Sequence, residues 1–199
     1  MRILVFGGTG VVGRAAVAEL SQRHEVVTVG RNSGDFQGDI SQSDALPELF
    51  GRLGKFDALV SCIGAVHFKP LNEMGEQEWL FGIQHKLMVQ VNLVQVGMDH
   101  ANDGASFTLT SGLLNRDPIV SGSSAAMVNG ALEGFVTAAA QELPRGMRLN
   151  VVSPGLLQGA AEAYAPWFRG FQPIPDERAG LAYARCVEGA INGQTLLIH

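Results

Sequence analysis

The sequence has few of the residues that mark disulfide-rich, metal-binding or nucleic-acid-binding proteins. Cysteine occurs only twice in 199 residues, at Cys62 and Cys186, which is too little for a disulfide framework and indicates reduced thiols in a reducing compartment. No cysteine–histidine cluster has the spacing of a zinc site, so no metal is expected. Lysine and arginine form no run and the net charge is −5, which argues against nucleic acid and anionic membranes as partners.

Long apolar segments are missing as well. No apolar run reaches the roughly 18 residues of a membrane span, and no basic and apolar leader precedes the first predicted strand. We therefore expect a soluble, cytoplasmic protein. With 46% apolar residues and 25 glycines, the chain is suited to one glycine-rich α/β domain over residues 1–199, long enough to bury a sizeable core.

A glycine-rich stretch near the N-terminus organises the chain. An apolar strand is predicted over residues 2–6 and a helix over residues 14–20, and between them Gly8, Gly10 and Gly13 match the G-x-G-x-x-G spacing of dinucleotide-binding turns. The three glycines allow a tight turn, a close approach to a pyrophosphate, and close packing of helix on strand. The helix N-terminus adds free N–H groups that favour phosphate. The alternative is a plain structural turn.

The end of the second predicted strand, residues 24–29, indicates which dinucleotide binds. An NAD site usually has Asp or Glu here for the ribose 2′-hydroxyl, whereas an arginine suits the 2′-phosphate of NADP. This strand is followed by Arg31 and Asn32, and Asp35 comes only after a Ser-Gly turn. The pattern favours NADP over NAD, with a solvated loop arginine as the alternative.

The rest of the chain alternates predicted strands with predicted helices. Further strands are expected at residues 36–40, 56–61, 105–109, 148–152 and 195–198, and helices at residues 41–52, 71–100, 123–142 and 175–191, with a loop at 156–174. This alternation predicts a Rossmann-type, doubly wound parallel sheet of about seven strands between two layers of helices. Ligands bind such sheets beyond the carboxyl ends of the strands.

Several stretches together resemble the short-chain dehydrogenase/reductase family over essentially the whole chain. They are the cofactor turn Gly7-Gly8-Thr9-Gly10-Val11-Val12-Gly13, the pair Asp39-Ile40, the strand ends Cys62-Ile63-Gly64-Ala65 and Leu109-Thr110-Ser111-Gly112, and the segment 141–155 that ends in Ser153-Pro154-Gly155. The resemblance implies an NADP-binding oxidoreductase that acts on a carbonyl or alcohol. It also implies a homodimer or homotetramer that pairs through the two long middle helices.

The resemblance, together with the strand-end arginine, assigns the cofactor site. The expected cofactor-binding residues are Gly7, Gly8, Thr9, Gly10, Val11, Val12, Gly13, Arg31, Asn32, Asp39, Ile40, Cys62, Ile63, Gly64, Ala65, Lys86, Thr110, Pro154 and Gly155.

The sequence departs from the family at the catalytic Tyr-x-x-x-Lys motif. Counting back from residues 133–135 places the tyrosine at Ala125 and the lysine at Asn129. Alanine cannot donate a proton, and asparagine can hydrogen-bond a ribose but carries no charge. The family's asparagine in the preceding helix falls at Lys86, and Ser111 matches its catalytic serine.

Three residues are therefore candidates for catalysis. Ser111 could bind a substrate carbonyl or only cap a turn. Lys86 could replace the missing lysine or lie in solvent, and Tyr164 could replace the phenol or serve aromatic packing. We expect Tyr164 to line a small apolar or aromatic pocket with Phe68, Trp167 and Phe168. A role for His67 as acid or base is the weaker alternative to an exposed loop histidine.

Two functions remain open. The first is an NADP-dependent oxidoreductase with a non-standard proton donor, acting on an unidentified small molecule. The second is a catalytically inactive NADP-binding or sensing protein that keeps the fold, because a fold alone does not fix a function.

Overall fold

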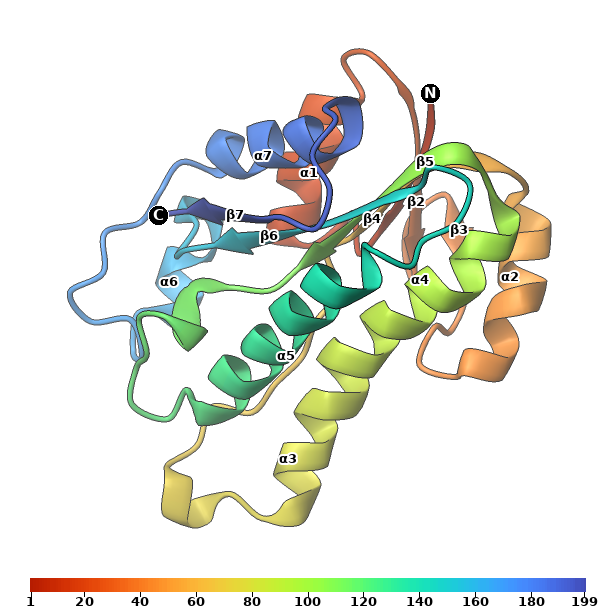
Figure 1. Ribbon diagram of the computed structural model, residues 1–199. Coiled ribbons are helices and arrows are strands. Elements are labelled where there is room, and N and C mark those ends of the chain that lie inside the picture. Colours follow the sequence, from red (N-terminus) through yellow and green to blue (C-terminus); the bar gives the residue numbers. More distant parts are fainter.

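The computed structural model describes all 199 residues and shows a parallel sheet between two layers of helices (Figure 1). The strands are β1 (Arg2–Phe6), β2 (Glu25–Gly30), β3 (Phe36–Gln37), β4 (Phe56–Ser61), β5 (Ala101–Thr110), β6 (Arg148–Pro154) and β7 (Thr195–Ile198). Their order is β3-β2-β1-β4-β5-β6-β7, and every pair is parallel. The predicted doubly wound sheet is confirmed, and its order reverses between β1 and β4.

The helices occupy the connections between strands. They are α1 (Val11–Leu20), α2 (Leu46–Leu53), α3 (Glu76–Gly82), the π-helical turn η3 (Ile83–Met88), α4 (Val89–His100), α5 (Ser123–Ala139), α6 (Ala161–Tyr164) and α7 (Asp176–Glu188). Short 3₁₀ turns are η1 (Ser43–Ala45), η2 (Leu71–Glu73), η4 (Leu113–Asn115) and η5 (Gln158–Ala160). None of these helices combines the length and the hydrophobicity that crossing a bilayer requires.

Side chains from both faces of the sheet are buried, because successive residues of a strand point to opposite sides. In β1, Ile3 and Val5 join a core cluster with Tyr183 under the layer of α1 and α7. Leu4 and Phe6 point to the other layer, formed by α2, α4 and α5. Figure 1 shows the two layers on either side of the strands. The packed sheet therefore holds the strand ends rigidly in place.

Some boundaries differ from the sequence-based expectation. The third strand is only two residues long, and the five residues between β2 and β3 are too few for a helix and form none. The strand β5 begins at Ala101 rather than residue 105. Residues 102–104 are exposed and show no apolar pattern, so the sequence did not indicate this earlier start. The predicted helix at 71–100 begins only at Glu76, after the separate 3₁₀ turn η2, and runs through α3, η3 and α4. The π-helical turn η3 in its middle was not predicted.

Candidate functional site

A cavity of about 420 Å³ opens at the carboxyl edge of the sheet, where ligands of doubly wound folds bind. Its lining comes from the ends of β4, β5 and β6 and from η3, α5 and the α6 region. The predicted site residues in this lining are Val12, Cys62, Ile63, Gly64, Ala65, Lys86, Thr110, Ser111, Pro154, Gly155 and Tyr164. The structure thus brings most of the predicted site together.

The remaining predicted cofactor residues follow the strands β1, β2 and β3. Because all strands are parallel, these residues lie at the same edge of the sheet as the cavity. The turn before α1 contains Gly7, Gly8, Thr9 and Gly10, and the first turn of α1 contains Val11 and Gly13. The turn after β2 contains Arg31 and Asn32, and the segment after β3 contains Asp39 and Ile40. Asp39 is exposed, whereas the side chain of Ile40 is buried in the core below α2.

Steric contacts explain three glycines of the N-terminal turn. Gly7 has a positive φ of 77°. A Cβ on Gly8 would lie 2.9 Å from Thr28 Cγ2, and one on Gly13 would lie 2.1 Å from the carbonyl oxygen of Gly7. A Cβ on Gly10 would come no closer than 3.5 Å to any atom, and its φ is an ordinary −73°. Packing therefore does not require glycine at position 10, whereas a phosphate approaching the α1 N-terminus does.

The turn after β2 leaves one arginine free. Asp35 folds back onto Thr28, whose backbone N–H and hydroxyl both donate to its carboxylate at 2.8 Å. These bonds hold the pKa of Asp35 below its usual range, and the bond from the backbone N–H has the larger effect. Asp35 is therefore engaged in the turn, whereas Arg31 is exposed and makes no hydrogen bond or ion pair. This arrangement is suited to a cofactor phosphate near Arg31.

Lys86 is the one charged residue in the cavity lining. The π-helical turn η3 carries it, and its Nζ donates to the carbonyl oxygen of Ser111 at 2.9 Å. Its aliphatic stem packs on Gly64, where a Cβ would lie 2.9 Å from Cγ and Cδ of Lys86. No carboxylate forms an ion pair with it, and burial lowers its pKa to about 8. The prediction of a solvated lysine is therefore wrong.

Ser111 reaches the cavity as predicted, but its hydroxyl is engaged elsewhere. The hydroxyl donates to Glu133 Oε1 on α5 at 2.9 Å. Glu133 is only 8% exposed and also accepts hydrogen bonds from Asn115 and from the guanidinium of Arg116. The single hydroxyl proton of Ser111 thus points to a carboxylate, and a contact with a substrate carbonyl stays a prediction.

Gln90 is a functional neighbour that sequence reasoning missed. It is fully buried in α4 and its amide pairs with both the N–H and the carbonyl of Thr110 at 2.9 Å. The same amide nitrogen donates to the carbonyl of Lys86 at 3.2 Å. Gln90 therefore fixes the turn that carries Lys86 to the end of β5. A glutamine between Val89 and Val91 was the available signal.

Tyr183 is the second residue that was missed. Its phenol, on α7, lies 2.6 Å from the hydroxyl of Thr110, which also bonds to the carbonyl of Ser61 at 2.5 Å. Burial raises the pKa of Tyr183 and raises the pKa of the neighbouring Cys62 thiol to about 12. Cys62 is thus a protonated thiol at neutral pH.

The positions that align with the family dyad both line the cavity. Ala125 and Asn129 lie on α5 and are almost fully buried. The amide nitrogen of Asn129 packs on Gly112, but its Oδ1 has no hydrogen-bond partner. A buried acceptor without a partner is unusual in a folded protein. It is suited to a ligand hydroxyl.

Aromatic side chains form the outer wall. The ring of Tyr164 lies 5.8 Å from that of Phe68 and 5.8 Å from that of Phe168, both edge-on. Trp167 stacks obliquely on Phe68 at 5.4 Å but is outside the cavity lining. Tyr164 makes no side-chain hydrogen bond and is 38% exposed. His67 packs on Phe81 at 4.4 Å and does not line the cavity.

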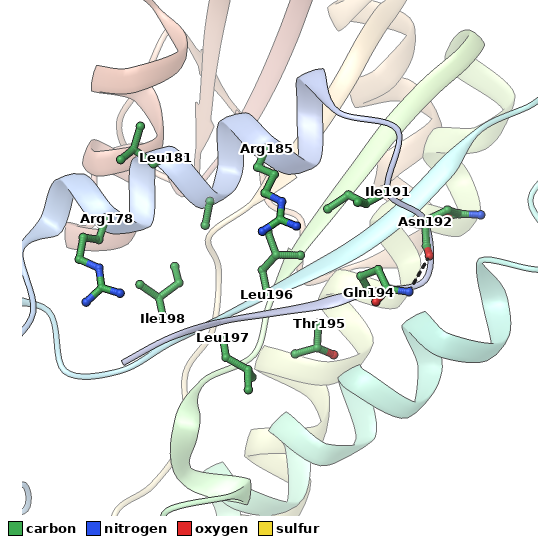
Figure 2. A pocket seen from close by; sticks show the side chains of 11 residues that line it. Arg178, Leu181, Arg185, Ile191, Asn192, Gln194, Thr195, Leu196, Leu197 and Ile198 are labelled. Carbon is green, nitrogen blue, oxygen red and sulfur yellow. Dashed lines mark hydrogen bonds between the residues drawn. The ribbon is translucent and has the colours of Figure 1, made fainter.

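A second cavity, of about 590 Å³, lies between α7 and the edge strand β7 (Figure 2). Arg178 and Arg185 border it on the helix, and Leu196 and Ile198 on the strand. It contains no predicted site residue, and it lies away from the carboxyl edge between β1, β4 and β5. The smaller cavity is therefore the candidate functional site.

Comparisons with known proteins show the family to which the chain belongs. A family model described as enoyl-(acyl carrier protein) reductase matches residues 7–183. The protein lin1944 from Listeria innocua has the same fold, with 42% identity, full coverage of both chains and a TM-score of 0.98. The chain belongs to the short-chain dehydrogenase/reductase family of oxidoreductases. A search of curated proteins finds no match.

Two more distant structures share the fold. A small-chain dehydrogenase in complex with NADPH is 23% identical, with a TM-score of 0.87 over 100% of this chain and 96% of that one. A short-chain dehydrogenase/reductase from Serratia marcescens BCRC 10948 is 21% identical, with a TM-score of 0.82 over 99% of this chain and 95% of that one.

Proposed function

We propose that this protein is an NADP-dependent oxidoreductase that reduces the carbonyl group of a small apolar or aromatic compound, with Lys86 as the proton donor. One observation carries the proposal. Lys86 is the only charged residue in a mostly apolar cavity at the cofactor edge of the sheet, and its pKa is lowered to about 8. A general acid works best when its pKa lies near the operating pH.

The residues at the sheet edge fit NADP. The N-terminus of α1 at Gly10 would hold the pyrophosphate, Arg31 and Asn32 the 2′-phosphate, and the orphaned Oδ1 of Asn129 a ribose hydroxyl. Asp39 and Ile40 stand where the family contacts adenine. The NADPH complex of a structural relative supports this choice. When bound, the cofactor would supply the hydride.

The lysine takes over a task that the family gives to a phenol. With Ala125 in place of that phenol, the α5 residues that line the cavity, Ala125 and Asn129, include no hydroxyl or charged group to pass a proton to the substrate. The Lys86 ammonium can do so and can stabilise negative charge that develops on the carbonyl oxygen in a desolvated cavity. Ser111 and Tyr164 are the other candidates for the proton donor. The hydroxyl proton of Ser111 is bonded to Glu133, whereas that of Tyr164 is free.

The proposal is tested with a panel of aldehydes and ketones and the variants Lys86→Met, Lys86→Arg and Tyr164→Phe. We expect Lys86→Met to lower kcat roughly 10²–10⁴-fold, the usual contribution of a general acid. Tyr164→Phe should change kcat little. Unchanged turnover in Lys86→Met would refute Lys86 as the donor, and a large loss in Tyr164→Phe would assign the proton to Tyr164.

Cofactor preference needs a separate measurement. Titration with NADPH and with NADH, followed by nicotinamide fluorescence, should show tighter binding of NADPH. Arg31→Ala should weaken NADPH roughly 10–100-fold, since a hydrogen bond to a charged group contributes about 1.5–3 kcal/mol, and should leave NADH unchanged. The control Arg52→Ala, on α2, should change neither. Equal affinity of the wild type for both dinucleotides would contradict an NADP site.

The alternative is an NADP-binding sensor without turnover, which the loss of the phenol at Ala125 favours. Tight NADPH binding without reduction of any compound in the panel would support it. We further propose a homodimer or homotetramer through α4 and α5, because Met88 and Met127 on these helices and the adjoining turn are about 40% exposed.

A further inference from the structure

The peptide of Ser111 lies between the proposed proton donor and a buried carboxylate. Its carbonyl oxygen accepts from Lys86 Nζ at 2.9 Å, and its hydroxyl donates to Glu133 Oε1, also at 2.9 Å. Ser111 lines the cavity, whereas Glu133, on α5, does not. Ser111 thus connects Glu133 to Lys86 through hydrogen bonds.

Three side chains hold Glu133 in place. The guanidinium of Arg116 bonds to both of its carboxylate oxygens, a paired geometry that fixes position as well as charge. Asn115 donates to Oε2 at 2.9 Å. With Ser111, all these donors come from the short segment that follows β5. Glu133 thus anchors that segment to α5, and Arg116 neutralises its charge.

The position of the Lys86 amine depends on the segment that Glu133 anchors, because the amine bonds to the carbonyl of Ser111. This amine stands at the end of four flexible carbons, and the carbonyl of Ser111 is its only hydrogen-bond acceptor. The other titratable side chains in the cavity lining are Cys62 and Tyr164, and neither makes a hydrogen bond to Lys86. Gln90 bonds to the backbone of Lys86 and of Thr110 but makes no hydrogen bond to Ser111.

We infer that Glu133 is a positioning residue, which acts through the hydroxyl and carbonyl of Ser111 to hold the Lys86 ammonium at the cavity. The inference rests on the proposed function. It also assigns Ser111 a different part from the one its motif suggests: the hydroxyl is the anchor, and the main-chain carbonyl faces the reacting group.

The test measures the pKa of Lys86 in the protein without cofactor. The rate of acetylation of Lys86 by acetic anhydride is followed against pH by mass spectrometry in the wild type, Glu133→Ala and Ser111→Ala. Without the anchor the ammonium regains water, so its midpoint should rise from about 8 toward 10.5 by at least one pH unit, which is a tenfold change in protonation equilibrium. The double variant should show the same rise as either single one, because both remove one connection.

Conservative variants separate positioning from structure. Ser111→Thr keeps a hydroxyl for Glu133, and it should retain the midpoint near that of the wild type. A midpoint that stays near 8 in Glu133→Ala and Ser111→Ala would overturn the inference, as would a rise in only one of them. If Glu133→Ala does not fold, Glu133→Leu replaces it, and the acetylation midpoint of Lys86 is compared in Glu133→Leu, Ser111→Ala and Ser111→Thr. A midpoint near 8 in Glu133→Leu or in Ser111→Ala would overturn the inference in the same way.

The two proposals fail in different ways. Full carbonyl reduction by Lys86→Met would reject Lys86 as proton donor, whatever the acetylation midpoints are. Loss of reduction in Lys86→Met together with unchanged midpoints in Glu133→Ala and Ser111→Ala would reject the positioning role alone.

Discussion

The phenolic oxygen of Tyr183 lies 2.6 Å from the hydroxyl oxygen of Thr110, across the interface between α7 and the sheet. Because the Thr110 hydroxyl donates to the carbonyl of Ser61, the Tyr183 hydroxyl is the donor to Thr110. The bond ties the outer helix to the ends of β4 and β5, directly beneath the candidate site.

Removing this hydroxyl should lower stability without changing the fold. We expect Tyr183→Phe to reduce the free energy of unfolding by about 0.5–1.5 kcal/mol, the usual contribution of one hydrogen bond. Urea denaturation measures it. The chain offers its own control in its other tyrosine, because Tyr164→Phe removes a hydroxyl that bonds to nothing and should leave the midpoint unchanged. Equal midpoints for all three proteins would show that the buried bond contributes nothing.

Two glycines of the N-terminal turn should respond differently to the same substitution. Gly13→Ala places a Cβ 2.1 Å from the Gly7 carbonyl and should destabilise the fold strongly. Gly10→Ala meets no atom closer than 3.5 Å, so the protein should fold normally but bind NADPH at least tenfold more weakly. Thermal denaturation and nicotinamide fluorescence separate the two effects. NADPH binding that survives Gly10→Ala would contradict a pyrophosphate at this turn.

The rate of carbonyl reduction should fall as the pH rises through about 8. Lys86 is protonated below this pKa and loses the proton that it donates above it. The profile of kcat against pH measures this. In Lys86→Arg the guanidinium stays protonated to about pH 12, so any residual activity should lack the decline near pH 8. A wild-type profile that is flat from pH 7 to 9.5 would speak against Lys86.

The same pKa has a consequence for stability. In the unfolded chain the pKa of lysine is near its ordinary 10.5, and in the folded protein that of Lys86 is about 8. Between these values the unfolded state binds more protons, so this residue makes the folded protein relatively more stable as pH rises. Wild type should therefore gain stability over Lys86→Met between pH 8 and pH 10.5, measured by urea denaturation. A constant difference would mean that Lys86 titrates alike in both states.

Exposed methionines on the middle helices should mark the oligomer interface. We expect the wild type to sediment as a dimer or tetramer at micromolar concentration, and Met127→Glu on α5 to shift it to a smaller species. The control Leu71→Glu introduces the same charge at a more exposed residue of η2 and should not change assembly. A wild type that is monomeric would remove the interface.

Most of the fold was predictable from local sequence patterns. Apolar strands such as β1 alternate with helices at regular intervals, and the glycine spacing between β1 and α1 fixed the first unit. The five residues between β2 and β3 are too few to form a helix there. The polar start of β5 carries no such pattern, and its place in the sheet depends on Phe56 pairing with Ala101.

The candidate site was predictable in its membership but not in its contacts. Motif matching brought Lys86, Ser111 and Asn129 to the cavity because the strand ends and the α5 face are set by the fold. It did not show that Ser111 donates to Glu133 or that Tyr183 reaches Thr110, since these partners are distant in sequence and belong to no motif. Side-chain pairs across layers depend on packing that one sequence does not reveal.

The position of Lys86 on a π-helical turn bears on how such a site could arise or vanish. A π turn inside a helix contains one more residue than the α-helical path around it. Deleting one residue of this turn before Lys86 would change the rotation of α3 relative to Lys86 and α4 by roughly 100°, since an α-helix has 3.6 residues per turn, while Gln90 still joins Lys86 to Thr110. A single codon, gained or lost within this turn, thus sets which face of α3 is in line with Lys86 and the cavity.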